Sequence, residues 1–209
     1  MTQAAAASDQ VAAILEFWFG ADHAQTEAHV IVSRQAAPWW GKNPEVDQDM
    51  RVRFGPLLED AAQNRLADWA EQPQSMLALI LLLDQFSRNI HRGTPQSFDY
   101  DDMARQYCHL ALAMGLDQQV TPIQRVFFYL PLEHSEDADD QQYSLQLFRA
   151  LAKNAAGADQ ACFDDFLKFA QRHAVIIERF GRFPHRNQIL GRASTPEEVE
   201  FLKQPGSSF

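Results

Sequence analysis

A basic turn near the C-terminal end of the chain has the residue types of an anion-binding site. The stretch RFGRFPHRNQILGR, residues 179–192, combines four arginines with a histidine, an asparagine and two phenylalanines. Residues 172–192 hold five arginines and one acid and so carry +4, although the whole chain carries −10. Guanidinium groups bind carboxylates and phosphates through paired hydrogen bonds, and aromatic rings stack on their planes. We therefore predict a small anionic ligand in a pocket lined by arginine and histidine.

A second polar group interrupts an apolar helix pattern in LALILLLDQFSRNIHRG, residues 77–93. A carboxylate behind such a run is costly to bury unless it is paired, and Arg88 lies one helical turn after Asp84. One interpretation is an Asp84–Arg88 pair that fixes the end of the helix. The other is that Arg88, His91 and Arg92 project beyond the apolar part into the pocket.

A third group follows a proline in FFYLPLEHSED, residues 127–137. Pro131 removes a backbone donor, so we expect the helix to kink or end there. His134 is a candidate general acid or base with Glu133 or Glu136 tuning it. Ser135 lacks the GxSxG turn of a nucleophile elbow, which disfavours a serine nucleophile. The alternative is a hydrogen-bonded network that holds the arginines in place.

The predicted site takes residues from all three segments. The ligand-binding candidates are Arg88, Arg92, Arg179, Arg182, Arg186 and Asn187. The candidates for acid–base catalysis are His134, Glu136 and His185, with Trp39, Trp40 and Phe183 as apolar walls. Hydrolysis and isomerisation both use such groups, and the sequence leaves open whether the protein is an enzyme.

Two alternatives of other kinds compete with this site. A helical array can bind an extended peptide in a concave groove, with arginines holding the peptide's terminal carboxylate, or act as a scaffold. The arginines can also be purely structural, each saturated by the protein's own carboxylates and carbonyls.

Composition disfavours several classes of function. An acidic balance of 18 basic to 28 acidic residues disfavours nucleic-acid binding. The sequence has no glycine-rich phosphate loop, no GxGxxG and no HxxxH or HExxH spacing, so we expect no cofactor and no metal. The longest apolar run, residues 76–83, is too short to span a membrane, and the N-terminus lacks the features of a signal peptide. We expect a cytoplasmic protein; its oligomeric state does not follow from the sequence.

The elements that must position these residues are helices. Apolar residues recur with helical spacing, and no alternating strand or hairpin turn is evident. Ser8, Thr121 and Thr195 are plausible N-caps, while Gly181 can end a helix in the left-handed conformation. Asp101 and Asp102 favour the first turn of another helix. Helix pairs recur about every 40 residues in the second half. We predict one all-α domain over residues 1–209, an array of antiparallel helix pairs with flexible ends at 1–8 and 204–209.

The three segments together resemble a known family. LLLDQFSRNIHRGTPQSF, FYLPLEHSED and RFGRFPHRNQILGRASTPEEVEFL are similar to signature blocks of an uncharacterised bacterial family, domain of unknown function 924. The early ILEFWFG and PWW elements are similar too, so the resemblance covers about residues 11–202. It implies a bacterial origin and an all-helical, tetratricopeptide-repeat-like fold, and it implies no reaction, substrate or cofactor.

Overall fold

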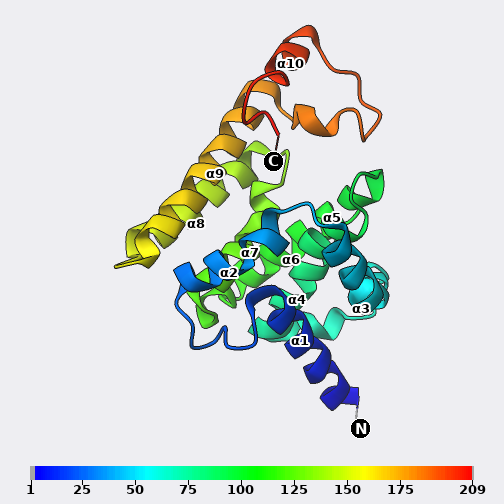
Figure 1. The fold of residues 1–209 in the computed structure, drawn as a ribbon, viewed down its shortest axis with the longest axis vertical. Coiled ribbons are helices and arrows are strands. Elements are labelled where there is room, and N and C mark those ends of the chain that lie inside the picture. Colours follow the sequence, from blue (N-terminus) through cyan, green and yellow to red (C-terminus); the bar gives the residue numbers. More distant parts are fainter. Residues whose placement is uncertain (1–2, 209) are drawn as a thin grey trace.

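The computed structural model describes residues 3–208, and these form helices and turns with no β-strand among them (Figure 1). The predicted all-α class is therefore confirmed. The main helices are α1 (Gln3–Phe19), α2 (Ala28–Trp40), α3 (Pro44–Ala62), α4 (Pro73–Ile80), α5 (Ser87–Ile90), α6 (Asp101–Ala113), α7 (Pro122–Glu133), α8 (Ala138–Asn154), α9 (Asp159–Phe180) and α10 (Pro196–Phe201).

The centre of the molecule is a helix that is apolar on every side. It consists of α4 and a π-helical segment, η2 (Leu81–Phe86), and all of residues 76–86 are buried. Helices α1, α3, α6 and α7 pack around it and bury residues 76–86. This packing explains the unbroken apolar run, since a helix that is hydrophobic all round requires neighbours on every side.

The second half of the chain adds an antiparallel pair of helices. Helices α8 and α9 pack along their length and extend away from the central helices, and the segment after α9 folds back toward the 133–137 turn (Figure 1). Gly181 ends α9 in the left-handed conformation with φ of 65°, as predicted. A tetratricopeptide-like repeat remains a prediction.

Several helix ends follow the sequence signals. Thr195 and Glu198 form a capping box at α10: Oγ1 of Thr195 accepts the Glu198 N–H at 3.2 Å, and the Glu198 carboxylate accepts the Thr195 N–H at 2.7 Å. Thr121 precedes Pro122 at the start of α7, and its N–H is accepted by Gln124 at 3.0 Å. These predicted caps are confirmed.

Other ends differ from the prediction. Helix α1 already begins at Gln3, five residues before the predicted cap Ser8, because the alanine run 4–7 has high helix propensity. Residues 3–8 are therefore helical, whereas 204–208 form turns; residues 1, 2 and 209 lie outside the described part. Helix α7 continues through Pro131 to Glu133 and ends within one turn of the proline.

Candidate functional site

Asp84 is the centre of a polar cluster inside the protein. It lies in the π-helical segment η2, and only 1% of its surface is exposed. Its carboxylate accepts hydrogen bonds from Nδ1 of His134 at 2.7 Å, Nη2 of Arg88 at 3.2 Å and the Gln85 amide at 2.5 Å. π-Helical turns are rare and occur often at functional sites. The predicted Asp84–Arg88 pair is thus confirmed, and His134 joins it from α7.

Burial and the neighbouring charges determine the protonation states of Asp84 and His134. Burial alone would raise the pKa of Asp84, but the neighbouring His134 and Arg88 and the hydrogen bonds from His134 and Gln85 hold it well below its usual value. For His134, burial lowers the pKa, and Arg88 lowers it further against the opposing effect of Asp84. A neutral His134 therefore donates its Nδ1 proton to an ionised Asp84, which leaves the lone pair on Nε2.

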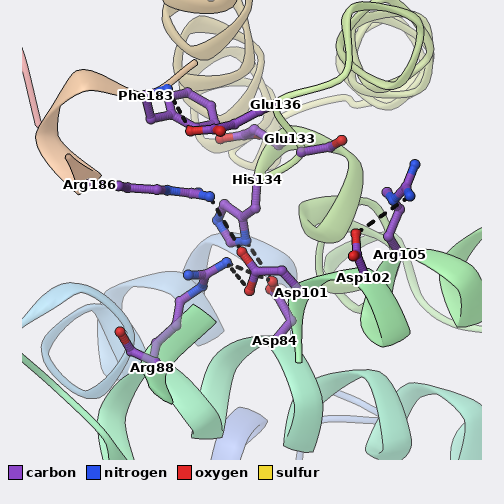
Figure 2. A network of polar contacts seen from close by, with 12 residues as sticks. Asp84, Arg88, Asp101, Asp102, Arg105, Glu133, His134, Glu136, Phe183 and Arg186 are labelled. Carbon is purple, nitrogen blue, oxygen red and sulfur yellow. Dashed lines mark hydrogen bonds and ion pairs between the residues drawn. The ribbon is translucent and has the colours of Figure 1, made fainter. Parts of the chain in front are cut away.

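Asp101 joins two arginines from distant parts of the chain. Its Oδ1 accepts from Nη2 of Arg88 at 2.9 Å, and its Oδ2 accepts from Nη1 of Arg186 at 3.4 Å. Figure 2 shows Arg88 and Arg186 approaching Asp101 from different sides, beside His134 and Asp84. The predicted meeting of residues from all three segments is seen here for Arg88, His134 and Arg186.

Arg186 is buried with little hydrogen bonding. Its side chain is 8% exposed, and its guanidinium carbon lies 4.9 Å from the Phe98 ring centroid and 4.5 Å from that of Phe183. Its Nε has no hydrogen-bond partner among the described residues. Burial lowers the pKa of Arg186 to about 10, and the neighbouring charge of Arg88 adds to the effect. Arginine carries five N–H donors, so one long hydrogen bond leaves most of its capacity unused.

Beside this cluster a second histidine–carboxylate pair is buried. Nδ1 of His173 lies 2.9 Å from Oε1 of Glu133, and the His173 ring is 6.2 Å from that of His134. The consecutive residues Glu133 and His134 thus contact different partners. The sequence offered Glu133 or Glu136 as the carboxylate that tunes His134, whereas in the structure Asp84 binds the imidazole.

Glu136 holds the C-terminal segment instead. It accepts two hydrogen bonds from Arg192, at 2.7 and 3.0 Å, and one from the backbone N–H of Phe183 at 2.7 Å. These contacts dock the turn that carries His185 and Arg186. His185 lies with its ring 5.7 Å from that of Phe183, and burial, with the charge of Arg186, lowers its pKa to about 3.

The other predicted ligand-binding residues form ion pairs or hydrogen bonds outside this cluster. Arg182 makes two hydrogen bonds to Glu198, at 2.6 and 2.8 Å, and Asn187 contacts the same carboxylate at 3.3 Å. Arg179, which is 47% exposed, pairs with Glu197. Arg92 pairs with Asp47 on α3. The contacts of Arg179 and Arg182 match the structural interpretation of the basic turn.

The aromatic residues expected as apolar walls of the pocket do not all line this cluster. Trp39 lies in the core, where its Nε1 donates to the Trp18 carbonyl at 2.8 Å, whereas Trp40 is exposed. Phe183 is fully buried against the Arg186 guanidinium. Phe98 and Asp101 are the residues that sequence reasoning missed: Asp101 had only a helix-start signal, and Phe98 had only its place at the end of the first signature block.

Two surface depressions lie away from the cluster. One, of about 390 Å³, is lined by residues of α1, α2 and α3, including Phe17, Pro38 and Asp49. The other, of about 510 Å³, is lined by Lys168, Arg172, Val175, Ile176 and Phe201 among others. Neither is lined by the basic turn, and the cluster meets solvent through the partial exposure of residues such as Arg88, Asp101 and His134.

The sequence of this chain matches the model of a protein family. The model of a bacterial protein family of unknown function, DUF924, matches residues 14–206. The chain belongs to the DUF924 family. The match spans every residue of the cluster, so the predicted resemblance is confirmed.

A solved structure agrees with this assignment. A similar fold is seen in the solved structure of a protein of unknown function from Agrobacterium tumefaciens, which is 39% identical to this chain with a TM-score of 0.77. The alignment covers 97% of this chain and 99% of the other. No curated protein matches the sequence. None of the helices in the described part is long and apolar enough to cross a membrane.

Proposed function

We propose that this DUF924 protein binds a small anion with Arg88 and Arg186, and that His134 acts on the bound molecule as a general base. The observation that carries the proposal is the state of Arg186. A buried guanidinium with one hydrogen bond of 3.4 Å and an unpartnered Nε is costly to keep unless it has a further partner. An anionic ligand would supply that partner.

The role of His134 follows from Asp84. The carboxylate of Asp84 fixes the imidazole with its proton on Nδ1, as a carboxylate does for a catalytic histidine. The Nε2 lone pair then accepts a proton from the ligand or from a water molecule beside it. Negative charge that develops on the ligand is stabilised by the two arginines, which are already in position. Both hydrolysis and isomerisation use such a step.

The protein is proposed to work in the cytoplasm. Cys108 and Cys162 are both free thiols, which fits a reducing compartment. Binding of a peptide through its terminal carboxylate is the proposed alternative; it places the same chemical group on the same arginines.

The test is a titration followed at His134. Imidazole nitrogen resonances of the wild type, recorded by NMR, are expected to report Nδ1–H and a free Nε2, and Nε2 should shift saturably with one or more small carboxylates or with inorganic phosphate. Arg186→Gln is expected to weaken that response about tenfold or more. Arg179→Gln removes an exposed cation and serves as the control, with wild-type binding expected.

Two results would contradict the proposal. One is the absence of any saturable shift across carboxylates and phosphate. The other is equal affinity of the Arg186→Gln and wild-type proteins, which would separate the ligand from this arginine.

A further inference from the structure

We propose that the anion is a carboxylate, and that its carboxylate group takes the position now held by Asp101 between Arg88 and Arg186. This inference rests on the proposed function and names the chemical class of the ligand. Asp101 is then a competitor built into the chain, which the ligand displaces.

The contacts of Asp101 outline a carboxylate subsite. Each of its oxygens accepts from a different guanidinium, Oδ1 from Arg88 and Oδ2 from Arg186 (Figure 2). A planar group with two oxygens can thus bridge both arginines at once, which is the geometry that guanidinium groups recognise well. A free carboxylate can form the same bridge and, because it is not tethered to α6, can also approach the Nε of Arg186, which Asp101 leaves without a partner among the described residues.

The arginines keep their positions without Asp101. The Phe98 ring lies under both guanidinium groups, with centroid distances of 5.3 Å to Arg88 and 4.9 Å to Arg186. Phe183 stacks on Arg186 as well, and Asp84 holds Arg88 from the other side. The subsite is therefore preorganised by aromatic packing and by a buried carboxylate, which lowers the cost of exchanging one bridging group for another.

Asp101 can leave its position between the arginines more easily than Asp84 can leave the cluster. Its side chain is 22% exposed, whereas that of Asp84 is 1% exposed. Asp101 is also the first residue of α6, where a negative charge interacts favourably with the helix dipole even after it turns to solvent. Releasing it therefore leaves no buried charge behind.

Charge balance favours a carboxylate over phosphate. Arg88 and Arg186 carry two positive charges, and Asp84 and Asp101 carry two negative ones beside a neutral His134. Exchange of Asp101 for a monocarboxylate preserves this balance. A phosphate carries close to two negative charges, so it would leave the buried cluster with an excess of negative charge. Such an excess is costly in a site of low exposure.

The experiment compares binding of acetate and inorganic phosphate to the wild type, Asp101→Ala and Asp101→Asn. Removal of the competitor is expected to tighten acetate binding to Asp101→Ala by roughly tenfold or more, because the fraction of protein with a free subsite rises. Asp101→Asn retains the shape of the side chain and loses its charge, so its affinity for acetate is expected to lie between those of the wild type and Asp101→Ala. Asp102→Ala, at the neighbouring 88% exposed residue, is the control with wild-type affinity.

The outcomes separate this inference from the proposed function. Equal acetate affinity of the wild type and both Asp101 variants would overturn the subsite, even if the wild type binds anions as proposed. A gain for phosphate that exceeds the gain for acetate would overturn the ligand class. In the Asp101→Ala background, Arg186→Gln is expected to abolish the gain; if the gain persists, the bridge is wrong. Failure of every variant and the wild type to bind any anion would overturn the proposed function itself.

Discussion

The Arg186 guanidinium lies 3.4 Å from the carboxylate of Asp101, although the two residues are 85 positions apart in the sequence. This contact joins the segment after α9 to the first turn of α6. It completes a cluster in which a buried histidine–aspartate pair lies beside two arginines. Glu136 holds the segment that carries Arg186 through hydrogen bonds from Arg192 and from the backbone of Phe183.

Loss of the charge on Asp84 is expected to destabilise the fold. Asp84→Asn removes the buried partner of Arg88 and His134, and breaking a buried pair in this way costs about 3 kcal/mol or more. The free energy of unfolding from urea denaturation measures the effect. Asp49→Asn, at an exposed pair with Arg53, is the matched control and should change stability by less than about 0.5 kcal/mol. Equal losses in the two variants would contradict the central role of Asp84.

Stability is expected to fall as the pH drops below about 6.5. The pKa of His185 in the folded protein is about 3. As the pH falls, the unfolded chain therefore protonates at His185 first and becomes more stable relative to the folded state. The stability is complete above the unfolded pKa and is lost progressively toward the folded one, by up to about 1.4 kcal/mol per pH unit. His185→Gln should show a shallower decline in unfolding free energy between about pH 6.5 and pH 5. Parallel curves for the two proteins would refute the assignment.

Arg186 is expected to contribute little to stability. Arg186→Met keeps apolar contact with Phe98 and Phe183 and removes an under-bonded buried cation, so the free energy of unfolding should change by less than about 1 kcal/mol or rise. Arg182→Met should lower stability, since it breaks a two-bond contact to Glu198. A larger loss at Arg186 than at Arg182 would show that Arg186 is retained for structure.

Two glycines are expected to respond differently to alanine. Gly181→Ala places a side chain at φ of 65°, which costs about 1 kcal/mol and weakens the cap of α9. Gly55→Ala lies inside α3, where the added carbon makes an ordinary contact with Cγ of Arg51 at 4.0 Å, but it directly precedes Pro56. The gain in helix propensity of about 0.5–1 kcal/mol is therefore opposed by crowding against the proline ring, and the net change should be smaller than the loss at Gly181. Thermal unfolding of both variants compares the two effects. Stabilisation by Gly181→Ala would mean that α9 does not end in this conformation.

The sequence by itself determined the class of the fold and many of its ends. Helical spacing of apolar residues, the cap at Thr195 and the left-handed stop at Gly181 act over a few positions, so local physics decides them. The Asp84–Arg88 pair was also predictable, because four residues span one helical turn and a buried carboxylate needs a partner. The family could be recognised from the three signature segments.

Only the tertiary structure decided which charges meet. The basic turn supplied four similar arginines, and nothing local distinguishes Arg186, which reaches the cluster, from Arg182, which is bound by Glu198. Likewise, Asp84 rather than Glu136 holds His134, because α7 and the π-helical segment pack side by side. Which of several like-charged side chains binds a given partner depends on the packing of helices that are far apart in sequence. The spacing of residues along the chain does not indicate that packing.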